Sequence, residues 1–361
     1  MTTSFLKLIL VVALPLLLGA GCLSISQSNG VETSGPGGMF VSVDKGESWQ
    51  PISTKPTAQG VQNISNVSVY RLIPDLQDTK TMYWLSREQG LFYTYDDGKT
   101  WQQASSPLSS GFVYSIAIHP EDVCTVYATD GSHVYKSIDC NRTWEEVYRE
   151  SRTSAGIRAL LVNPFSPYQI LLAETNGDLL QSFDLGKSWS VSKRFKSNIV
   201  SLIADPAQPG VIYLITKSQG LYRSSDGGLT WNSLVEGLKK YSKATEFRYF
   251  YIHPNKKDTL YWISTYGILV SKDGGVNWDT LSLITPPGSA QIYSFAINPE
   301  NDREIYYTAT INNRSTFYRS IDGGSNWITR KMPSGQIPTA LRVHPERSEL
   351  LYLGFTIPPK E

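Results

Sequence analysis

The sequence predicts an all-β protein, a seven-bladed β-propeller built from four-stranded antiparallel blades. Three observations lead to this fold class. A turn motif occurs seven times, an apolar strand pair with a proline turn occurs seven times, and each end of the chain carries half of one repeat. A repeat of this length and strand content is typical of one propeller blade.

The composition agrees with this fold class. The chain has 361 residues, of which 40% are hydrophobic and 12% are aromatic, and its formal net charge is +1. This is enough apolar material for a large core, and the abundance of Tyr, Trp and Gly favours strands and turns over helices. The near-neutral charge and the lack of a long basic run argue against a nucleic-acid partner.

The turn motif reads Ser/Thr-x-Asp-x-Gly-x-Ser/Thr/Asn-Trp. An Asp carboxylate can accept backbone N–H groups that follow it, which closes a tight turn. The Gly two positions later can adopt a positive φ, and the copy at 137–144 has Asn141 there, the next-best residue. The Trp buries a large ring under the turn. These fourteen structural positions are Asp44, Asp96, Asp139, Asp184, Asp226, Asp273 and Asp322, and Trp49, Trp101, Trp144, Trp189, Trp231, Trp278 and Trp327.

Between the motifs lie pairs of apolar strands, the first of which ends at a proline. Each blade therefore consists of strands A and B, joined by the proline turn, and strands C and D, joined by the Asp turn. The chain begins with a C–D pair at 37–52 and ends with an A–B pair at 339–355. We expect the N-terminal C–D strands to pair with the C-terminal A–B strands, which closes the ring and protects its edges.

The first residues predict an export signal rather than a part of the fold. An apolar run at 8–18 follows Lys7, which is too short to span a bilayer and typical of a signal peptide. The segment from Leu18 to Cys22 resembles a bacterial lipobox, with Gly19 as a departure. We expect a lipoprotein signal peptide at 1–21, a flexible tether at 22–36 that starts from lipidated Cys22, and a propeller at 37–361. An ordinary signal peptide with an incidental cysteine is the alternative.

The seven motifs resemble the Asp-box, or BNR-repeat, β-propellers. Such repeats occur in sialidases, in xyloglucan-cleaving glycosidases, in sortilin-type receptors and in a photosystem II assembly factor that is a lipoprotein in cyanobacteria. The resemblance implies that the Asp turns are structural elements at the blade periphery. It implies the fold but not the function.

No catalytic residue can be nominated from the sequence. The nearest match to the Arg-Ile-Pro of sialidases begins at Arg71 and has one residue too many, and sialidase propellers have six blades. No pair of carboxylates suggests a glycosidase site. Four arginines on the expected innermost strands, three or six residues before the repeat proline, are candidates for partner binding: Arg71, Arg158, Arg248 and Arg342.

Histidines and cysteines predict no metal or cofactor site. His119, His253 and His344 occupy equivalent turn positions before a proline, and His133 stands alone in a B–C loop. Cys124 opens strand B of a blade whose Asp turn contains Cys140, so we expect a disulfide between them, as suits an exported protein. Two free thiols are the alternative.

The face that carries the D–A and B–C loops is expected to be rich in cations. It is either a solvated rim or a docking face. The residues concerned are Arg87, Arg152, Arg194, Lys196, Lys217, Lys239, Lys240, Arg314, Arg330 and Lys331.

Together these features predict a lipid-anchored, extracytoplasmic protein of the bacterial cell envelope. Its expected role is that of a non-enzymatic binding or assembly scaffold for an envelope protein, a peptide or a glycan. A carbohydrate-active hydrolase with an atypical site and a photosystem II assembly factor are the alternatives.

Overall fold

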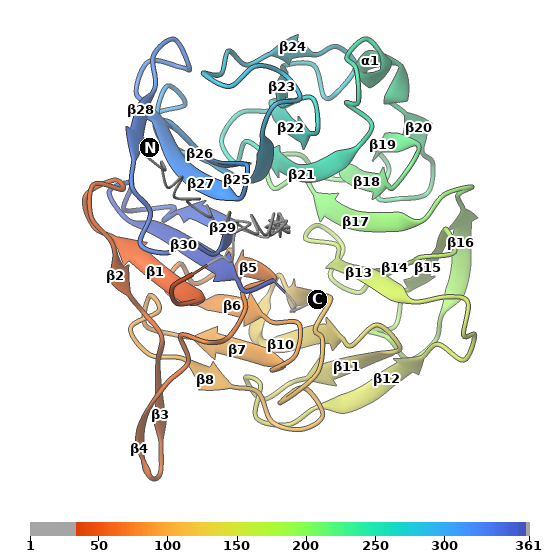
Figure 1. Ribbon diagram of the computed structural model, residues 1–361. Helices are drawn as coiled ribbons and strands as arrows, with labels where there is room; N and C mark the ends of the chain where they lie inside the picture. Colours follow the sequence, from red (N-terminus) through yellow and green to blue (C-terminus); the bar gives the residue numbers. More distant parts are fainter. Residues whose placement is uncertain (1–33, 359–361) are drawn as a thin grey trace, which may run out of the picture. The chain divides into compact units, whose positions relative to one another are not determined.

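The computed structural model describes residues 34–358, which form one compact unit (Figure 1). The expected signal peptide and Cys22 lie outside the described residues. Seven four-stranded antiparallel sheets follow one another around a ring, and one two-stranded hairpin is added. The prediction of a seven-bladed propeller is confirmed.

Blades 1 to 6 follow the chain in order, each running from its innermost to its outermost strand. Blades 1 to 3 are β5 (Arg71–Pro74), β6 (Met82–Leu85), β7 (Leu91–Thr94) and β8 (Gln102–Gln103); β9 (Ser115–His119), β10 (Asp122–Thr129), β11 (His133–Ser137) and β12 (Glu145–Arg149); and β13 (Ile157–Val162), β14 (Ile170–Glu174), β15 (Asp178–Ser182) and β16 (Ser190–Arg194). Blades 4 to 6 are β17 (Ile199–Ala204), β18 (Ile212–Thr216), β19 (Gly220–Ser224) and β20 (Asn232–Ser233); β21 (Phe247–Ile252), β22 (Leu260–Ser264), β23 (Ile268–Ser271) and β24 (Asp279–Thr280); and β25 (Gln291–Ile297), β26 (Ile305–Ile311), β27 (Arg314–Ser320) and β28 (Ile328–Arg330).

Blade 7 contains both ends of the chain. It combines β29 (Ile337–Val343) and β30 (Leu351–Thr356) with β1 (Gly38–Ser42) and β2 (Gln50–Pro51). β1 pairs antiparallel with β30 over five residues, from Gly38 opposite Phe355 to Ser42 opposite Leu351. The expected closure by two strands from each end is therefore confirmed.

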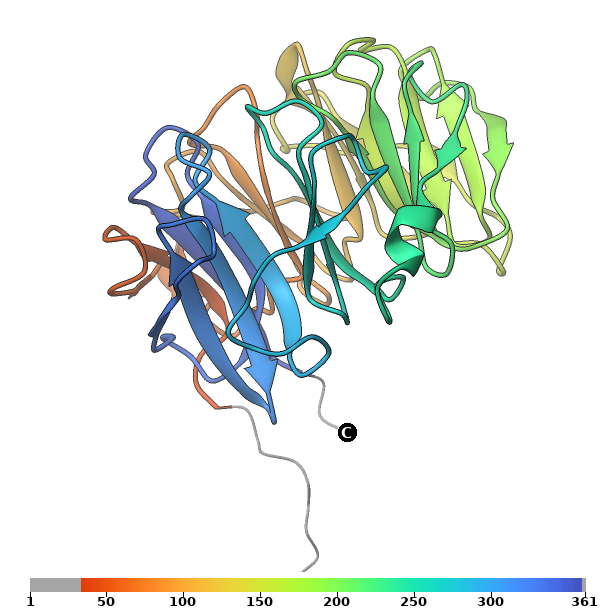
Figure 2. The ribbon, with the colours of Figure 1, turned by 90° about the horizontal axis from the view of Figure 1, so that it is seen from above.

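Each blade has two ends, which define two faces of the ring. The A–B turns and the Asp turns meet on one face, because the residue after the Asp donates to a carbonyl of the A–B turn, as Asp97 does to Lys80 at 3.0 Å. We call this the Asp-turn face. The D–A and B–C loops lie on the other side, which we call the loop face. The first and last described residues leave from the loop face, since Ser34 accepts from Gly335 and Ile357 donates to Ser68 (Figure 2).

The core consists of seven apolar clusters, and each one joins two neighbouring blades. The B strands supply fully buried aromatic side chains such as Trp84, Tyr127 and Trp262. Because both faces of these inner sheets are covered, their sequences read as continuous apolar runs rather than alternating ones. Among residues 34–358, no helix is long and apolar enough to cross a membrane.

Two D–A segments, at 59–66 and 238–247, contain regular structure. The first belongs to a hairpin of β3 (Thr54–Thr57) and β4 (Gly60–Asn63), which projects from the ring between blades 7 and 1 (Figure 1). The second overlaps α1 (Val235–Lys239), a single helical turn that packs on β19. Trp101 donates to Thr54 and holds the base of the hairpin.

Candidate functional site

The seven Asp turns are built alike, and their hydrogen bonds are closed within each turn. In the first copy, the Asp44 carboxylate accepts from the hydroxyls of Ser42 and Ser48 and from the Ser48 amide, and Gly46 N–H donates to Ser42 Oγ at 2.7 Å. Hydrogen bonds from Ser48, and next from Ser42, lower the pKa of Asp44 to about 2. Gly46 and its equivalents all have positive φ, including Asn141 at 68°. The carboxylates are therefore ionised and engaged structurally.

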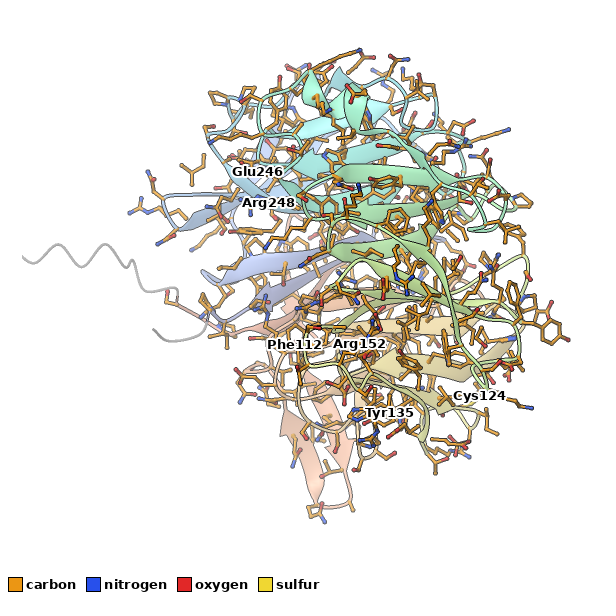
Figure 3. All side chains as sticks on the ribbon, turned by 90° about the vertical axis from the view of Figure 1, so that its right-hand side faces the viewer. Phe112, Cys124, Tyr135, Arg152, Glu246 and Arg248 are labelled. Carbon is orange, nitrogen blue, oxygen red and sulfur yellow. A yellow bond between two sulfur atoms is a disulfide. The ribbon has the colours of Figure 1, made fainter. Side chains whose placement is uncertain are left out.

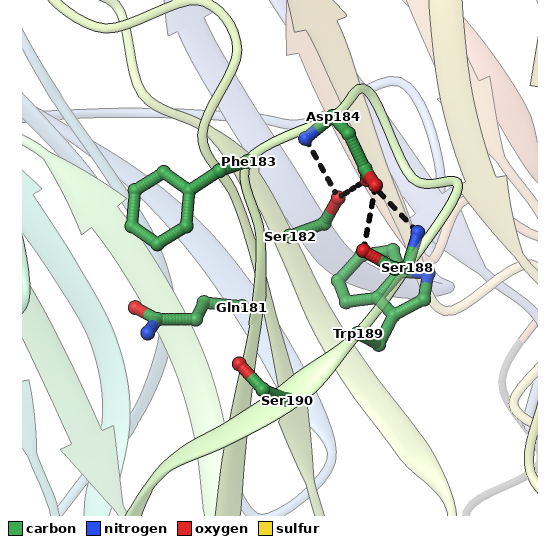
Figure 4. A pocket seen from close by; sticks show the side chains of 7 residues that line it. All are labelled: Gln181, Ser182, Phe183, Asp184, Ser188, Trp189 and Ser190. Atoms are coloured by element: carbon green, nitrogen blue, oxygen red, sulfur yellow. Dashed lines mark hydrogen bonds between the residues drawn. The ribbon is translucent and has the colours of Figure 1, made fainter.

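The motif tryptophans differ more than the sequence suggests. Trp101 and Trp278 are buried, whereas the other five are half-buried. In blade 3, Trp189 and the turn border a hollow of about 200 Å³ that is also lined by Gln181, Phe183 and Ser190 (Figure 4). The only carboxylate in this hollow, that of Asp184, is engaged by Ser182 and Ser188. The hollow therefore offers no free acid or base.

Cys124 and Cys140 form a disulfide in blade 2, as expected from their strand positions. The bond ties the start of strand B to the Asp turn across a separation of 16 residues. Closing a loop of this length stabilises the fold by about 3 kcal/mol through the unfolded chain. Reduction is expected to lower the free energy of unfolding by about that amount in urea titrations. A Cys124→Ser/Cys140→Ser variant should have the lower stability with and without reductant; a reductant-insensitive wild type would contradict this.

The structure places the four candidate arginines on inner strands at two levels. Arg158 and Arg248 lie near the loop-face ends of β13 and β21, where the register shifts by a bulge. A bulge re-aims the side chain it carries. Arg71 and Arg342 lie three residues further along their strands, and Arg342 Nε donates to the Leu72 carbonyl of the neighbouring inner strand at 3.3 Å. The four do not form one cluster.

The innermost strands of the blades surround the axis of the ring, which we call the channel, and aromatic rings accompany these arginines at its loop-face end. The Arg158 guanidinium lies 4.3 Å from the centre of the Tyr114 ring, and Tyr114 stacks on Phe112 at 3.9 Å. Phe112 packs edge to face on Tyr70, with 4.8 Å between the ring centres. The guanidiniums of Arg71 and Arg87 lie 5.0 and 5.6 Å from the centre of the Tyr70 ring. We call these six residues, Tyr70, Arg71, Arg87, Phe112, Tyr114 and Arg158, the channel-mouth arc.

A second pair stands on the other side of the ring. The Arg248 guanidinium lies 5.5 Å from the centre of the Tyr293 ring of blade 6. The Nε atom of Arg248 is buried and has no partner among the described residues. Figure 3 shows Arg248 and Phe112 on the side of the molecule away from Cys124, which belongs to the Asp-turn face.

The sequence interpretation missed the aromatic members of this site. Tyr114, Arg158, Arg248 and Tyr293 all fall six residues before the repeat proline. An alignment of the repeats at that proline would therefore have shown Arg or Tyr at this position in four of the seven repeats. Tyr70 and Phe112 have no such signal.

A group of buried carboxylates, also missed, surrounds Arg152 on the loop face. Arg152 contacts Glu150 at 2.8 Å, Glu174 at 2.6 Å and Asp178 at 2.9 Å, and Arg194 also reaches Asp178. Burial, and next the hydrogen bond to Glu150, raises the pKa of Glu174 to about 8. The Arg152 guanidinium lowers the pKa of Glu150 well below its usual range. Arg152 and Arg194 are therefore paired cations rather than free members of a docking face.

Two other expected members of the cationic face are also paired. Arg330 reaches Glu47 in the Asp turn of blade 7 at 2.5 Å, so its assignment to the loop face was wrong, because the short β28 brings it beside that turn. Lys239 pairs with Glu236 within α1.

The histidines act as turn residues. Nδ1 of His253 accepts the amide of Asn255, and Nδ1 of His344 accepts those of Glu346 and Arg347. Within residues 34–358, no group of three His, Cys, Asp or Glu side chains is placed to hold a metal ion.

Comparisons with known proteins agree with this architecture. The model of the family described as "Sortilin, neurotensin receptor 3" matches residues 37–155. A xyloglucanase from Paenibacillus sp. is 26% identical over 264 residues, which cover 66% of this chain and 23% of that protein. The chain thus spans about a quarter of the length of that relative.

Solved structures show the same fold at low identity. The GH74 xyloglucanase from Xanthomonas campestris superposes with a TM-score of 0.62 at 16% identity, over 80% of this chain and 51% of that one. YCF48 with a bound D1 peptide superposes with a TM-score of 0.58 at 15% identity, over 80% of this chain and 94% of that one. The chain shares its β-propeller fold with these proteins, and its residues 37–155 are similar to the sortilin family.

Proposed function

We propose that this protein is a non-enzymatic scaffold that binds an acidic segment of another envelope protein at the loop-face end of its channel. The observation that carries this proposal is the charge of the channel wall. The seven inner strands contain Arg71, Arg158, Arg248 and Arg342 and no Asp or Glu. A channel wall with one sign of charge concentrates ligands of the opposite sign.

The channel-mouth arc is suited to a peptide rather than to a simple ion. Its guanidiniums lie against aromatic faces, so one side of each is held in place while the edges can donate to carboxylates. The stacked rings of Phe112 and Tyr114 add an apolar platform beside them. Large aromatic side chains and Arg are the residue types that dominate binding energy at protein interfaces.

The likeness to YCF48, solved with a D1 peptide, supports a peptide partner. A lipid anchor at Cys22 remains part of the proposal. It would attach to the ring on the loop face, where residue 34 enters, and so hold the channel mouth toward the membrane and its proteins. The photosystem II assembly role is a narrower form of the same proposal.

A glycoside hydrolase is the second candidate, because the Paenibacillus relative is a xyloglucanase. Among residues 34–358, Glu150 and Glu174 are neighbouring carboxylates whose pKa values shift in opposite directions. They hydrogen-bond to each other, whereas glycosidase carboxylates stand roughly 5 to 9.5 Å apart around the scissile bond. The geometry therefore favours binding over hydrolysis.

The test is crosslinking of the tagged, full-length protein in its native envelope, followed by purification and quantitative mass spectrometry. Arg158→Ala/Arg248→Ala is expected to reduce the major crosslinked partner at least tenfold, because each lost charge-assisted contact is worth about 1.5 kcal/mol or more. A matched control, Lys99→Ala/Lys187→Ala, removes two cations from the Asp-turn face and should retain the partner.

Equal recovery from both variants would contradict the proposal. Release of reducing sugar from xyloglucan by the purified protein, abolished by Glu174→Gln, would favour the hydrolase instead.

A further inference from the structure

The formal net charge of +1 hides a separation of charge between the two faces. All seven motif aspartates lie on the Asp-turn face, and hydrogen bonds within the turns lower the pKa of Asp139, Asp184 and Asp322 to about 2, as they do for Asp44. Their hydroxyl and amide partners carry no formal charge, so hydrogen bonding leaves these seven negative charges in place beside the cations of the same turns, which are Lys45, Lys99, Arg142, Lys187 and Lys272.

The loop face has the opposite sign. Outside the channel, it carries exposed cations that form no ion pair among residues 34–358: Arg87, Lys196, Lys217, Lys240, Lys243, Arg314 and Lys331. Among residues 34–358, the loops of this face carry two exposed carboxylates that form no ion pair, Glu88 and Glu246. We call these seven cations the rim cations.

The rim cations lie at several places on the ring. Lys196, Lys217, Lys240 and Lys243 come from the loops of blades 3 to 5, Arg87 comes from blade 1, and Arg314 and Lys331 come from blade 6 and the loop after it. The first and last described residues leave on this same face. The 33 residues before the described part, with their apolar run at 8–18, therefore join the ring on its cationic side.

We infer that the loop face rests on an anionic membrane surface, with the rim cations on lipid headgroup phosphates around the channel mouth. Cations distributed over one plane match the distributed charge of a bilayer, whereas a protein ligand would favour a compact patch. The carboxylates of the opposite face are repelled by the same surface, so the charge separation sets the orientation. This contact goes beyond the proposed peptide binding, which uses the inner-strand arginines; Arg87 belongs to both groups, and the other six rim cations lie outside the channel-mouth arc.

The test uses the propeller itself, residues 34–361, which contain every strand of all seven blades and no lipidation site. Cosedimentation compares vesicles of phosphatidylcholine with vesicles that also contain about 30 mol% phosphatidylglycerol. Binding is expected only to the anionic vesicles, and it should fall steeply with added salt, because exposed charges are screened. Lys196→Gln/Lys217→Gln/Lys240→Gln is expected to weaken it about a hundredfold, at about fivefold per lysine near the surface.

The control variant, Lys99→Gln/Lys187→Gln/Lys272→Gln, makes the same change in net charge on the Asp-turn face and should bind as the wild type does. Equal weakening by both variants, or no binding to anionic vesicles, would overturn the inference. Binding of polyglutamate at the rim without vesicle binding would assign the rim to an acidic protein and overturn it as well. The Arg158→Ala/Arg248→Ala variant, which tests the proposed peptide binding, should still bind anionic vesicles. The two contacts can therefore fail independently of each other.

Discussion

Glu174→Gln is expected to remove a pH dependence of stability that the wild-type protein shows between about pH 4.5 and 8. Burial raises the pKa of Glu174 to about 8 in the folded state, from its ordinary value of 4.5. The folded protein therefore holds a proton that the unfolded chain releases, so this contribution to stability is complete below pH 4.5 and is lost as the pH rises to 8. One proton corresponds to a slope of at most about 1.4 kcal/mol per pH unit.

Gln at this position resembles the protonated acid, because its oxygen can accept from Arg152 while its amide donates to Glu150. The variant should match the wild type near pH 5 and exceed it near pH 8. His253 and His344, whose pKa values burial lowers, add an opposite trend, but they do so equally in both proteins. Urea titrations at intervals from pH 5 to 9 measure the difference, and parallel curves would show that Glu174 is ionised throughout.

Trp101→Ala is expected to lower the free energy of unfolding by about 3 to 5 kcal/mol, the range for a large aromatic side chain in a core. Trp101 is 0% exposed, packs edge to face on Trp84 at 5.4 Å, and donates from its indole to the Ile52 carbonyl at 2.7 Å. The variant would leave a cavity between blades 7 and 1, where the ring closes, together with an unpaired carbonyl.

Trp144→Ala provides the matched comparison, because Trp144 has the same place in its motif. Its ring is only half-buried and its indole nitrogen has no partner among the described residues, so its removal should have a clearly smaller effect. Thermal and urea unfolding of both variants measure the difference. Equal losses would mean that the motif position, rather than the depth of burial, determines the contribution.

The sequence predicts the propeller because its constraints are local and repeated. Each Asp turn encloses its own hydrogen bonds, and Asn141 could be identified as a substitute for Gly because the conformation requires a positive φ. The closure could be predicted by matching the unpaired halves at the two ends. The hairpin at 54–63 could not, because Thr, Lys, Gln and Pro give it no apolar period.

The candidate site was predicted only in part, since it is assembled by contacts between blades. The inner-strand arginines follow from the repeat, but the stacking of Tyr114 on Phe112 and of Arg158 on Tyr114 depends on how neighbouring strands turn at the bulge. The carboxylates around Arg152 come from two segments, because Glu150 lies two residues before Arg152 whereas Glu174 and Asp178 flank the turn between β14 and β15. The sequence therefore suggests that Arg152 is a free cation, whereas in the structure three carboxylates surround it.

The closing blade also has a consequence for biosynthesis. β1 and β2 emerge first from the ribosome, yet their sheet is completed only by β29 and β30 at the far end of the chain. Until β29 and β30 have been synthesised, β1 and β2 lack the other half of their sheet and the ring of blades stays open. A premature stop or a clipped C-terminus would remove half of that sheet and leave both edges free to pair with other chains. Closure of the ring can therefore occur only after β29 and β30 have been made.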